Sequence, residues 1–287
     1  MKQILSAILT LCLSVFAINA QELENSTLWK IEGQNLKQAS YLFGTIHMTC
    51  DASLNNDVLK ALDETTQIVL EIDMDDPSLQ AKMMGGMYMK DGKRISDFVS
   101  AEDYKLIDSM ITKEVGMPLK MLENMKPFFL ISMLYPKFLD CPMQSFEQEL
   151  MKIAAEQNEE ILGLETIEEQ MQVFEDIPYE DQVADLLRTA KDNLAYDKAT
   201  MKKMMEMYTS EDINAMVDLM NDDSYSAVAQ HQDKLLSNRN KNWIPKIENF
   251  IKDQPTFFGV GAGHLAGEFG VINLLRKAGY KVTAVMD

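Results

Sequence analysis

Histidine, cysteine and tryptophan are scarce in this chain of 287 residues, which contains three, three and two of them. Basic side chains are also few, because 27 lysines and arginines stand against 45 aspartates and glutamates and leave a formal net charge of −18. Nucleic acids and anionic lipid surfaces both select a basic footprint on their protein partners. We therefore expect no nucleic-acid or lipid-surface partner, and we expect most acidic side chains to form a solvated surface.

Long apolar runs are lacking beyond the first 20 residues. Lys2, the apolar residues 4–18 and the small-residue ending Asn19-Ala20 are typical of a signal peptide over residues 1–20. The apolar stretch is too short for an ordinary membrane span. The sequence thus predicts an exported mature chain over residues 21–287, periplasmic or secreted, with no transmembrane segment. Its length suits one large domain or a domain with a sizeable insertion.

Only two cysteines, Cys50 and Cys141, would remain after removal of the predicted signal peptide. Both lie in polar, turn-like contexts, and an exported compartment is oxidising. We therefore predict a Cys50–Cys141 disulfide; two unrelated buried thiols are the alternative.

Apolar runs near both ends of the mature chain predict the strands of an α/β core. A short apolar run bounded by turn residues is typical of a buried strand. The order strand, helix, strand over residues 40–73 predicts a βαβ unit with a parallel pair of strands. The C-terminal part predicts a helix over residues 267–277. The predicted strands cover residues 28–32, 40–46, 67–72, 160–165, 256–260 and 281–285.

The segment between these two ends has mostly helical spacing. We predict a single α/β domain over residues 21–287, with a large helical insertion at approximately 77–252. The core would be built from residues 28–75, 160–166 and 255–287. Methionines cluster at residues 83–89 and 201–207, where a mobile helical lid is favoured over a copper site because methionine often fills adaptable apolar faces.

Two matched glycine–histidine turns stand at the ends of predicted strands. Gly44-Thr45-Ile46-His47 follows one apolar run, and Gly261-Ala262-Gly263-His264 follows another. Histidine titrates near neutrality and is the commonest metal ligand. Glycine allows a sharp turn and leaves room for a ligand, so Gly44, Gly261 and Gly263 are expected to shape the site. Ligands collect at the carboxyl ends of strands in open α/β sheets, so both histidines should face one space.

Two glutamates close the predicted inner strands, Glu71 after Ile68-Val69-Leu70 and Glu165 after residues 161–164. A carboxylate at such a strand end costs desolvation unless it is paired, protonated or bound to a metal. Two histidines with one or two glutamates suit a zinc-type catalytic shell. A helix N-cap or a solvated strand end is the alternative for either glutamate.

The remaining candidates lie outside the strands. Arg239 sits in an amphipathic helical stretch, where a surface position is the default and an inward position could bind a carboxylate or an oxyanion. His231 has no strand or glycine context, and we interpret it as a surface or packing residue.

These motifs together resemble the TraB/GumN family, which belongs with the Tiki metalloproteases, the pheromone-shutdown protein PrgY, the erythromycin esterases and the haem-binding lipoprotein ChaN. The resemblance runs in order along essentially the whole mature chain. It is carried by Leu28-Trp29-Lys30-Ile31-Glu32-Gly33, Tyr41-Leu42-Phe43-Gly44-Thr45-Ile46-His47-Met48, Val69-Leu70-Glu71, Gly163-Leu164-Glu165-Thr166, Arg239-Asn240, and Val260-Gly261-Ala262-Gly263-His264-Leu265 with Gly267 and Gly270.

The resemblance implies an α/β core with one shared site. It makes His47, Glu71, Glu165 and His264 the ligand or acid–base set and Arg239 a site residue. For Tiki-like members it implies metal-dependent peptide cleavage.

Three hypotheses follow for the function. The favoured one is an exported metal-dependent hydrolase, a peptidase, in which zinc, manganese or cobalt is held by the histidines and one glutamate. The other glutamate would be the base, and Arg239 would steady the oxyanion. The alternatives are a metal-free esterase with a histidine base and a non-enzymatic protein that binds haem or metal. The sequence leaves the peptide or small-molecule substrate and the oligomeric state open.

Overall fold

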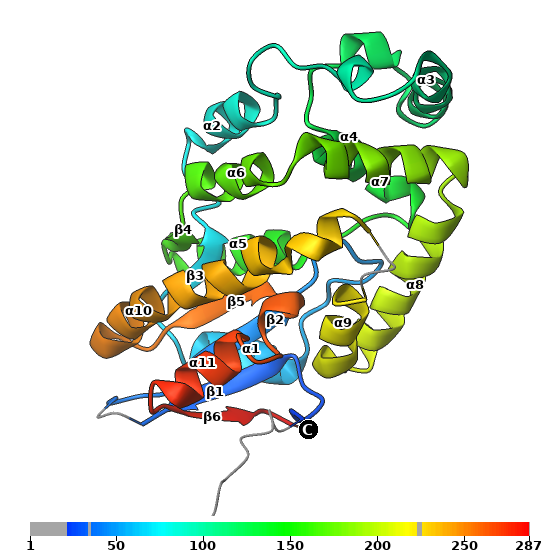
Figure 1. Cartoon of the computed structure of the whole chain (residues 1–287). Coiled ribbons are helices and arrows are strands. Elements are labelled where there is room, and N and C mark those ends of the chain that lie inside the picture. Colours follow the sequence, from blue (N-terminus) through cyan, green and yellow to red (C-terminus); the bar gives the residue numbers. More distant parts are fainter. Residues whose placement is uncertain (1–21, 34–35, 223–225, 287) are drawn as a thin grey trace, which may run out of the picture.

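The computed structural model describes residues 22–286 except 34–35 and 223–225, so the predicted signal peptide lies outside the described residues. Its centre is one six-stranded sheet with the strand order β4-β3-β5-β2-β1-β6 (Figure 1). The α/β fold class is therefore confirmed. The strands are β1 (Leu28–Glu32), β2 (Ser40–Thr45), β3 (Ile68–Ile72), β4 (Ile161–Glu165), β5 (Phe257–Gly261) and β6 (Lys281–Ala284).

Four neighbouring strands, β4, β3, β5 and β2, run parallel. Beyond them β1 pairs antiparallel with β2, and β6 pairs antiparallel with β1. β1 and β2, which follow each other in the chain, pair with each other. The expected pairing of β2 with β3 is wrong, because β5 from the far end of the chain lies between them and pairs with both. This insertion places the second Gly-x-x-His turn beside the first, with Thr45 level with Gly261.

Helices cover both faces of the sheet. On one face α10 (Asn238–Asp253) and α11 (Val271–Lys277) pack over a core that includes Trp29, Trp243 and Phe258. On the other face α1 (Asn56–Asp63) and α5 (Phe146–Gln157) pack over Phe43 and Phe257. α5 and α10 both fall within residues 77–252, so part of that segment belongs to the layers of the sheet.

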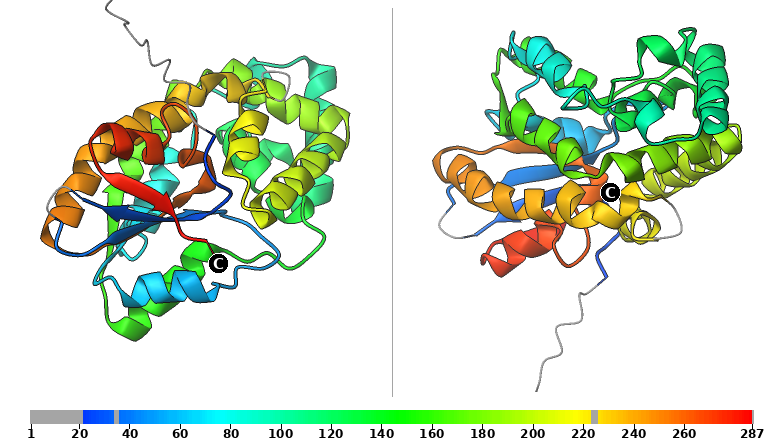
Figure 2. Two further views of the ribbon diagram at one scale, coloured as in Figure 1. Left: turned by 90° about the horizontal axis from the view of Figure 1, so that it is seen from below. Right: turned by 45° about the horizontal axis from the view of Figure 1, so that its top comes forward.

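Most of the remaining helices gather above the sheet in Figure 1 and again in the tilted view of Figure 2, and the last two of them, Ala195–Thr209 and Ile213–Met220, lie beside the sheet at the right of Figure 1. All of them except α9 (Ile213–Met220) contribute to a second core that includes Ile111, Leu130 and Leu186, whereas Ile213 of α9 belongs to the core under α10 and α11. These helices are α2 (Leu79–Gly86), α3 (Ala101–Val115), α4 (Pro127–Ser132), α6 (Ile167–Asp176), α7 (Tyr179–Lys191), α8 (Ala195–Thr209) and α9 (Ile213–Met220). Short helical turns lie at Ile95–Asp97, Leu119–Met121, Tyr135–Lys137, Val228–His231, Asp233–Ser237 and Ala262–His264.

The last helix is shorter than expected. A helix was predicted over residues 267–277, but α11 begins at Val271. Gly267 has a φ of +86°, a left-handed conformation that a right-handed helix excludes, and Gly270 is the N-cap in an extended conformation. The two glycines therefore form a turn between the Ala262–His264 turn and α11.

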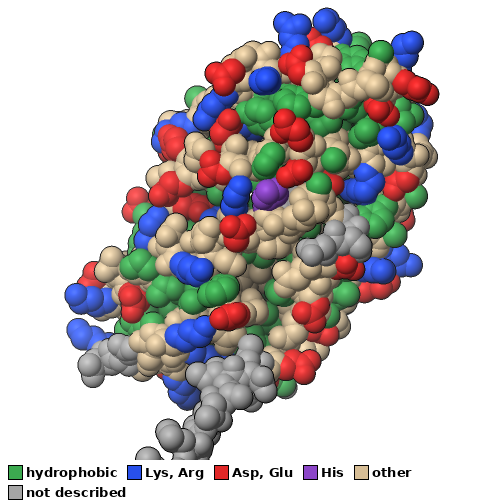
Figure 3. Space-filling model, in the orientation of Figure 1, with side chains coloured by type: hydrophobic (Ala, Val, Ile, Leu, Met, Phe, Trp, Pro, Cys, Tyr) green, Lys and Arg blue, Asp and Glu red, His purple; other side chains and the backbone are tan. Residues whose placement is uncertain are grey.

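Cys50 and Cys141 form the predicted disulfide, with their Cα atoms 5.6 Å apart. The surface in Figure 3 shows acidic and basic side chains interspersed, with apolar side chains between them. No continuous basic patch covers this face, in keeping with the net charge of −18.

Substitution of Gly163 by alanine should destabilise the fold. A Cβ atom there would lie 2.7 Å from the backbone nitrogen of Asp73 and 2.9 Å from the carbonyl oxygen of Glu165, neither of which can move without disturbing the pairing of β3 with β4. We expect a loss of about 1–3 kcal/mol in the free energy of unfolding, measured by urea denaturation.

Gly85→Ala is the matched control. Gly85 lies in α2 and a Cβ there would meet nothing within 4 Å. Alanine is the better helix former by roughly 0.5–1 kcal/mol, so this variant should be as stable as the parent or slightly more stable. Equal stability of the two variants would contradict the tight approach at Gly163.

Candidate functional site

The predicted site residues gather at the carboxyl ends of the parallel strands. β2 leads into His47, β3 carries Glu71, β4 ends on Glu165, and β5 ends on Gly261, three residues before His264. Parallel neighbours in a sheet are about 4.8 Å apart, so side chains at these strand ends can reach one another. Segments that are far apart in the sequence thus meet at one edge.

Arg239, at the start of α10, connects this group. Its Nη2 atom donates to Glu71 Oε2 at 2.6 Å and to Glu165 Oε1 at 2.6 Å, and its Nε atom donates to both oxygens of Glu165. Its Nη1 atom lies 3.0 Å from the carbonyl oxygen of Leu235 and 3.1 Å from His264 Nε2. A guanidinium has five N–H donors, so every donor of Arg239 has a partner. Arg239 is the buried counter-charge of both glutamates.

A π-helical turn precedes Arg239. It covers Asp233–Ser237 and ends where α10 begins. The carbonyl oxygen of Leu235, which lies in this turn, accepts from Nη1 of the Arg239 side chain. The local winding thus contributes to holding the guanidinium in place.

The two glutamates have different surroundings. Both oxygens of Glu165 are held by donors, Oε1 by Arg239 and Gln170 and Oε2 by Trp243 Nε1 at 3.1 Å. Glu71 accepts from Arg239 through Oε2, while its Oε1 accepts from the backbone N–H of Gly261 at 2.8 Å. Glu71 Oε1 therefore points toward the histidines, and Glu165 is the anchor of Arg239.

Charge holds Glu71 ionised. Burial raises the pKa of its carboxyl group, but the cations Arg239 and His47 and the hydrogen bond from the backbone N–H of Gly261 act in the opposite direction and leave it well below the usual range. The side chain of Glu71 is only 10% exposed and that of Arg239 only 12%. Little water therefore screens this ion pair.

His264 is a buried, neutral imidazole. Burial lowers its pKa to about 3. The Asn240 side chain donates through Nδ2 to the carbonyl oxygens of His264 and Phe269, so its Oδ1 faces His264 Nδ1 at 2.6 Å as an acceptor. The proton therefore sits on Nδ1, and the lone pair of Nε2 accepts from Arg239. Trp243 packs against the ring, with centroids 4.5 Å apart.

His47 has the opposite character. Its side chain is 64% exposed, and its Nδ1 atom lies 2.8 Å from Glu147 Oε1. The hydrogen bond to Glu147 raises the pKa of His47 to about 9. Burial raises the pKa of Glu147, but hydrogen bonds from His47, Ser145 and Thr45 outweigh it and bring the value to about 2. His47 and Glu147 thus form an ion pair at the entrance of the site.

A small space beside Gly261 joins the two histidines. A Cβ atom on Gly261 would lie 3.3 Å from Glu71 Oε1, 3.6 Å from His264 Cδ2 and 3.9 Å from His47 Nε2. These three groups therefore border one space that the missing side chain leaves open. The sequence prediction that the two histidines face the same space agrees with this geometry.

The other two glycines of the turns serve packing. A Cβ atom on Gly44 would lie 2.6 Å from Leu265 Cδ1 and 3.2 Å from the Cα atom of Ala262, and one on Gly263 would lie 2.9 Å from Met220 Sδ. Gly44 thus lets the two turns approach each other, and Gly263 lets α9 approach the second turn.

The imidazole nitrogens of the two histidines and the carboxylate oxygens of Glu71 are atom types that bind divalent metals. Each histidine has Nδ1 bound to an oxygen acceptor, which is the usual orienting contact of a metal-bound imidazole, and Glu71 Oε1 lies 3.7 Å from His264 Nε2. Within residues 22–286, apart from the two undescribed gaps, no three histidine, cysteine or acidic side chains are already arranged to hold a metal ion. Arg239 takes the lone pair of His264. Metal binding would therefore require Arg239 Nη1 to release His264 and His47 Nε2 to lose its proton.

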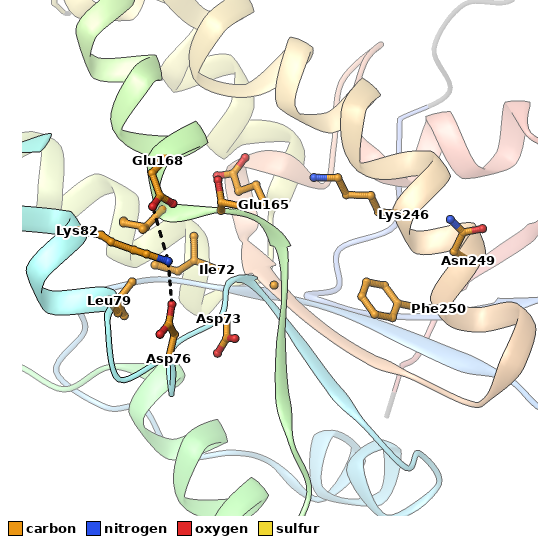
Figure 4. Close-up of a pocket in the computed structure, with 13 residues that line it drawn as sticks. Ile72, Asp73, Asp76, Leu79, Lys82, Glu165, Glu168, Lys246, Asn249 and Phe250 are labelled. Atoms are coloured by element: carbon orange, nitrogen blue, oxygen red, sulfur yellow. Dashed lines mark hydrogen bonds and ion pairs between the residues drawn. The ribbon is translucent and has the colours of Figure 1, made fainter.

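Two cavities border the buried end of the site. One, of about 430 Å³, lies between the carboxyl ends of β3 and β4, α2, α6 and α10, where Figure 4 shows Glu165, Lys246 and Phe250 around an open space. The other, of about 520 Å³, is lined by Arg239 and Trp243. Glu165, Glu168 and Lys246 line both cavities, which lie next to each other along α6 and α10.

Reasoning from the sequence missed several residues of this site. Glu147 and Gln170 lie in helices without a strand-end signal, and Asn240 and Trp243 lie one and four positions after Arg239. The spacing of Arg239, Asn240 and Trp243 on one helix is a signal that could have been used. His231 lies elsewhere, with Nε2 2.8 Å from Asp181 Oδ2, as expected of a packing residue.

The fold and site define an α/β protein with a histidine–glutamate–arginine cluster at the carboxyl edge of its sheet. The model of the TraB/PrgY/gumN family matches residues 27–284, and the chain belongs to this family. A curated relative, metalloprotease TIKI2 of Danio rerio, is 20% identical over 90% of this chain. The match covers 60% of the length of that relative. No solved structure gives a significant match.

Among the residues that the structure describes, no helix has both the length and the apolar character needed to cross a membrane.

Removal of the Arg239 charge should strongly destabilise the protein. Arg239→Met would leave the buried carboxylates of Glu71 and Glu165 without their counter-charge, a change that costs about 3–5 kcal/mol in comparable buried pairs. The pKa of Glu71 is depressed in the folded state, so its contribution is present at pH 7 and is lost as the pH falls through that pKa.

The deficit of Arg239→Met should shrink on acidification, because the carboxylates left without a counter-charge in the variant take up protons at a higher pH than in the parent protein. Urea denaturation at pH 7 and pH 4 measures this change. Arg188→Met, which removes an arginine paired with Asp197 in the helical part, is the control. A deficit of Arg239→Met that does not change with pH would contradict the role of Arg239 as counter-charge of Glu71.

Proposed function

We propose that this protein is an exported hydrolase that cleaves amide bonds of peptides with the help of a divalent metal ion, zinc, manganese or cobalt. The observation that carries the proposal is the space beside Gly261, bordered by His47, His264 and Glu71. Two imidazoles and one carboxylate are a frequent protein shell of catalytic zinc, which keeps a position open for water. Membership in a family with a curated relative named as a metalloprotease supports the same reaction class.

The residues of this chain have distinct roles in the proposal. His47 Nε2, His264 Nε2 and Glu71 Oε1 would hold the metal, which lowers the pKa of a bound water and polarises the scissile carbonyl. Asn240 fixes the tautomer of His264 that leaves Nε2 unprotonated. Glu71 would serve as the ligand rather than the base because its Oε1 faces the histidines.

Arg239 and Glu165 support this set. All donors of Arg239 are engaged, so an oxyanion could bind to it only if a partner left. We therefore assign Arg239 first to balancing the charge of Glu71, and Glu165 to holding Arg239 in place. The two cavities along α6 and α10 would accommodate parts of a peptide chain. Export is supported by the signal-like residues 1–20 and by the disulfide.

A second candidate is a metal-free hydrolase in which an imidazole acts as the base. The hydrogen bond of Arg239 to His264 Nε2 favours it, because this contact occupies the lone pair that a metal would need. His47, exposed and paired with Glu147, would then exchange protons with the substrate, and it would act as a base only after its imidazolium had lost the Nε2 proton.

Metal analysis combined with peptide cleavage separates the two candidates. We expect the purified mature chain to bind about one divalent ion, to cleave members of a peptide library, and to lose cleavage with a chelator. His47→Ala and His264→Ala should lose metal and cleavage together, with a fall in activity of at least about 100-fold. His231→Ala is the matched control and should change neither.

Cleavage that persists in full with chelator and without bound metal would establish the metal-free candidate. Absence of cleavage with metal bound would leave a metal-binding protein without turnover and would contradict both hydrolase candidates.

The two glutamates should respond differently to removal of their charge. Glu71→Gln should lower metal affinity by about 10–100-fold, because it removes a ligand oxygen charge. Glu165→Gln should retain more metal, because Glu165 contacts Arg239 and Trp243 rather than the space beside Gly261. Calorimetric titration with zinc or manganese measures both affinities. Equal loss in the two variants would contradict the separate roles.

A further inference from the structure

The loop that carries His47 is tied to the N-terminal end of α5 by a short antiparallel pairing. Thr49 and Gln144 exchange two backbone hydrogen bonds of 3.0 and 2.8 Å. The Gln144 side chain also accepts from the backbone N–H of Ala52 at 3.1 Å. The pairing lies two residues beyond His47 and three residues before Glu147, so it fixes the separation of the two side chains.

The disulfide closes the same junction. Cys50 follows Thr49 directly, and Cys141 lies three residues before Gln144. The bond joins segments separated by 91 positions in the sequence. A cross-link next to a two-stranded pairing disfavours separation of the strands, because it keeps the two segments close together and so reduces the conformational entropy that separation would gain.

The Glu147 carboxylate is held from several sides. Oε1 accepts from Thr45 Oγ1 at 2.8 Å and faces His47 Nδ1 at 2.8 Å, and Oε2 accepts from Ser145 Oγ at 2.6 Å. Thr45 is the last residue of β2 and is buried, so its hydrogen bond fixes the position of the Glu147 carboxylate relative to the sheet. With Nδ1 held in this way, Nε2 of His47 is directed to the space beside Gly261.

We propose that Glu147 is the positioning residue of His47 and that the Cys50–Cys141 disulfide maintains this position, so that reduction of the disulfide lowers the activity of the site. The inference rests on the proposed hydrolase function for its activity readout. Glu147 acts through His47, because Thr45, Ser145 and His47 already occupy its oxygens. An exposed histidine at a loop would otherwise sample several rotamers, and the pairing and the disulfide restrict them.

Proton NMR of the imidazole groups tests the positioning without any need for activity. A hydrogen-bonded Nδ1–H proton of His47 should appear as a slowly exchanging downfield signal, assigned by its loss in His47→Ala. It should disappear in Glu147→Ala and persist in Asp181→Asn. Asp181 is a matched control, because it makes the same 2.8 Å contact to His231.

In Cys50→Ser/Cys141→Ser the His47 signal should exchange faster with water than in the parent protein. A parent protein without this signal, or a signal indifferent to both Glu147→Ala and the cysteine double variant, would overturn the proposal whatever the protein cleaves.

Activity measurements then test the consequence for catalysis. Glu147→Ala should lower kcat by about 10–100-fold, the usual effect of removing the orienting partner of an active-site histidine. Glu147→Gln retains an oxygen acceptor and should recover part of this loss. In both variants KM should change far less than kcat. Asp181→Asn should have the kcat and KM of the parent protein.

The redox part of the proposal has its own control. Treatment with a phosphine reductant should bring the parent protein to the kcat of Cys50→Ser/Cys141→Ser and leave that double variant unchanged. An unchanged kcat of the parent after reduction, confirmed by thiol titration, would overturn the role of the disulfide. Loss of cleavage in every protein, with the NMR results as expected, would refute the proposed hydrolase and leave the positioning intact.

Discussion

The ion-pair cluster around Arg239 is the interaction on which the candidate site depends. Two carboxylates from neighbouring regions of the sheet edge, Glu71 and Glu165, are almost inaccessible to water, and one guanidinium compensates both. Burial of an unpaired carboxylate would be prohibitive, so the fold can place glutamates here only because α10 supplies the cation. The planar fork of arginine suits this task, since it contacts both carboxylates and the imidazole at once.

This cluster also divides the site into a rigid side and an accessible side. His264 is enclosed by Trp243, Asn240 and Arg239, which fix its orientation and its neutral state. His47 faces the exterior and depends on the loop that carries it. A substrate or a metal would therefore meet a preorganised imidazole on one side and a positioned, solvent-accessible one on the other. Preorganisation of this kind is what separates a reactive centre from a chance group of polar side chains.

The sequence could predict the parts of this protein that depend on local pattern. Apolar runs bounded by turn residues identified all six strands to within about two residues at each end, and glycine before histidine identified both turns. The disulfide was predicted from the two cysteines outside the predicted signal peptide, which allow only one pairing. The same apolar runs placed Glu71 and Glu165 at the ends of strands. Arg239 was suggested by resemblance rather than by its helical context.

Tertiary structure decided what depends on neighbours that are distant in the chain. β5 lies between β2 and β3, and nothing local in residues 40–73 indicates that a strand nearly 200 positions later separates them. The partnership of Glu147 with His47 is equally non-local, since it depends on where α5 begins relative to β2. The sequence by itself therefore determined which candidate residues stand at the strand ends and which strands hold them. Only the folded chain decided which carboxylate faces a histidine and which anchors the arginine, because hydrogen-bond partners are set by packing rather than by periodicity.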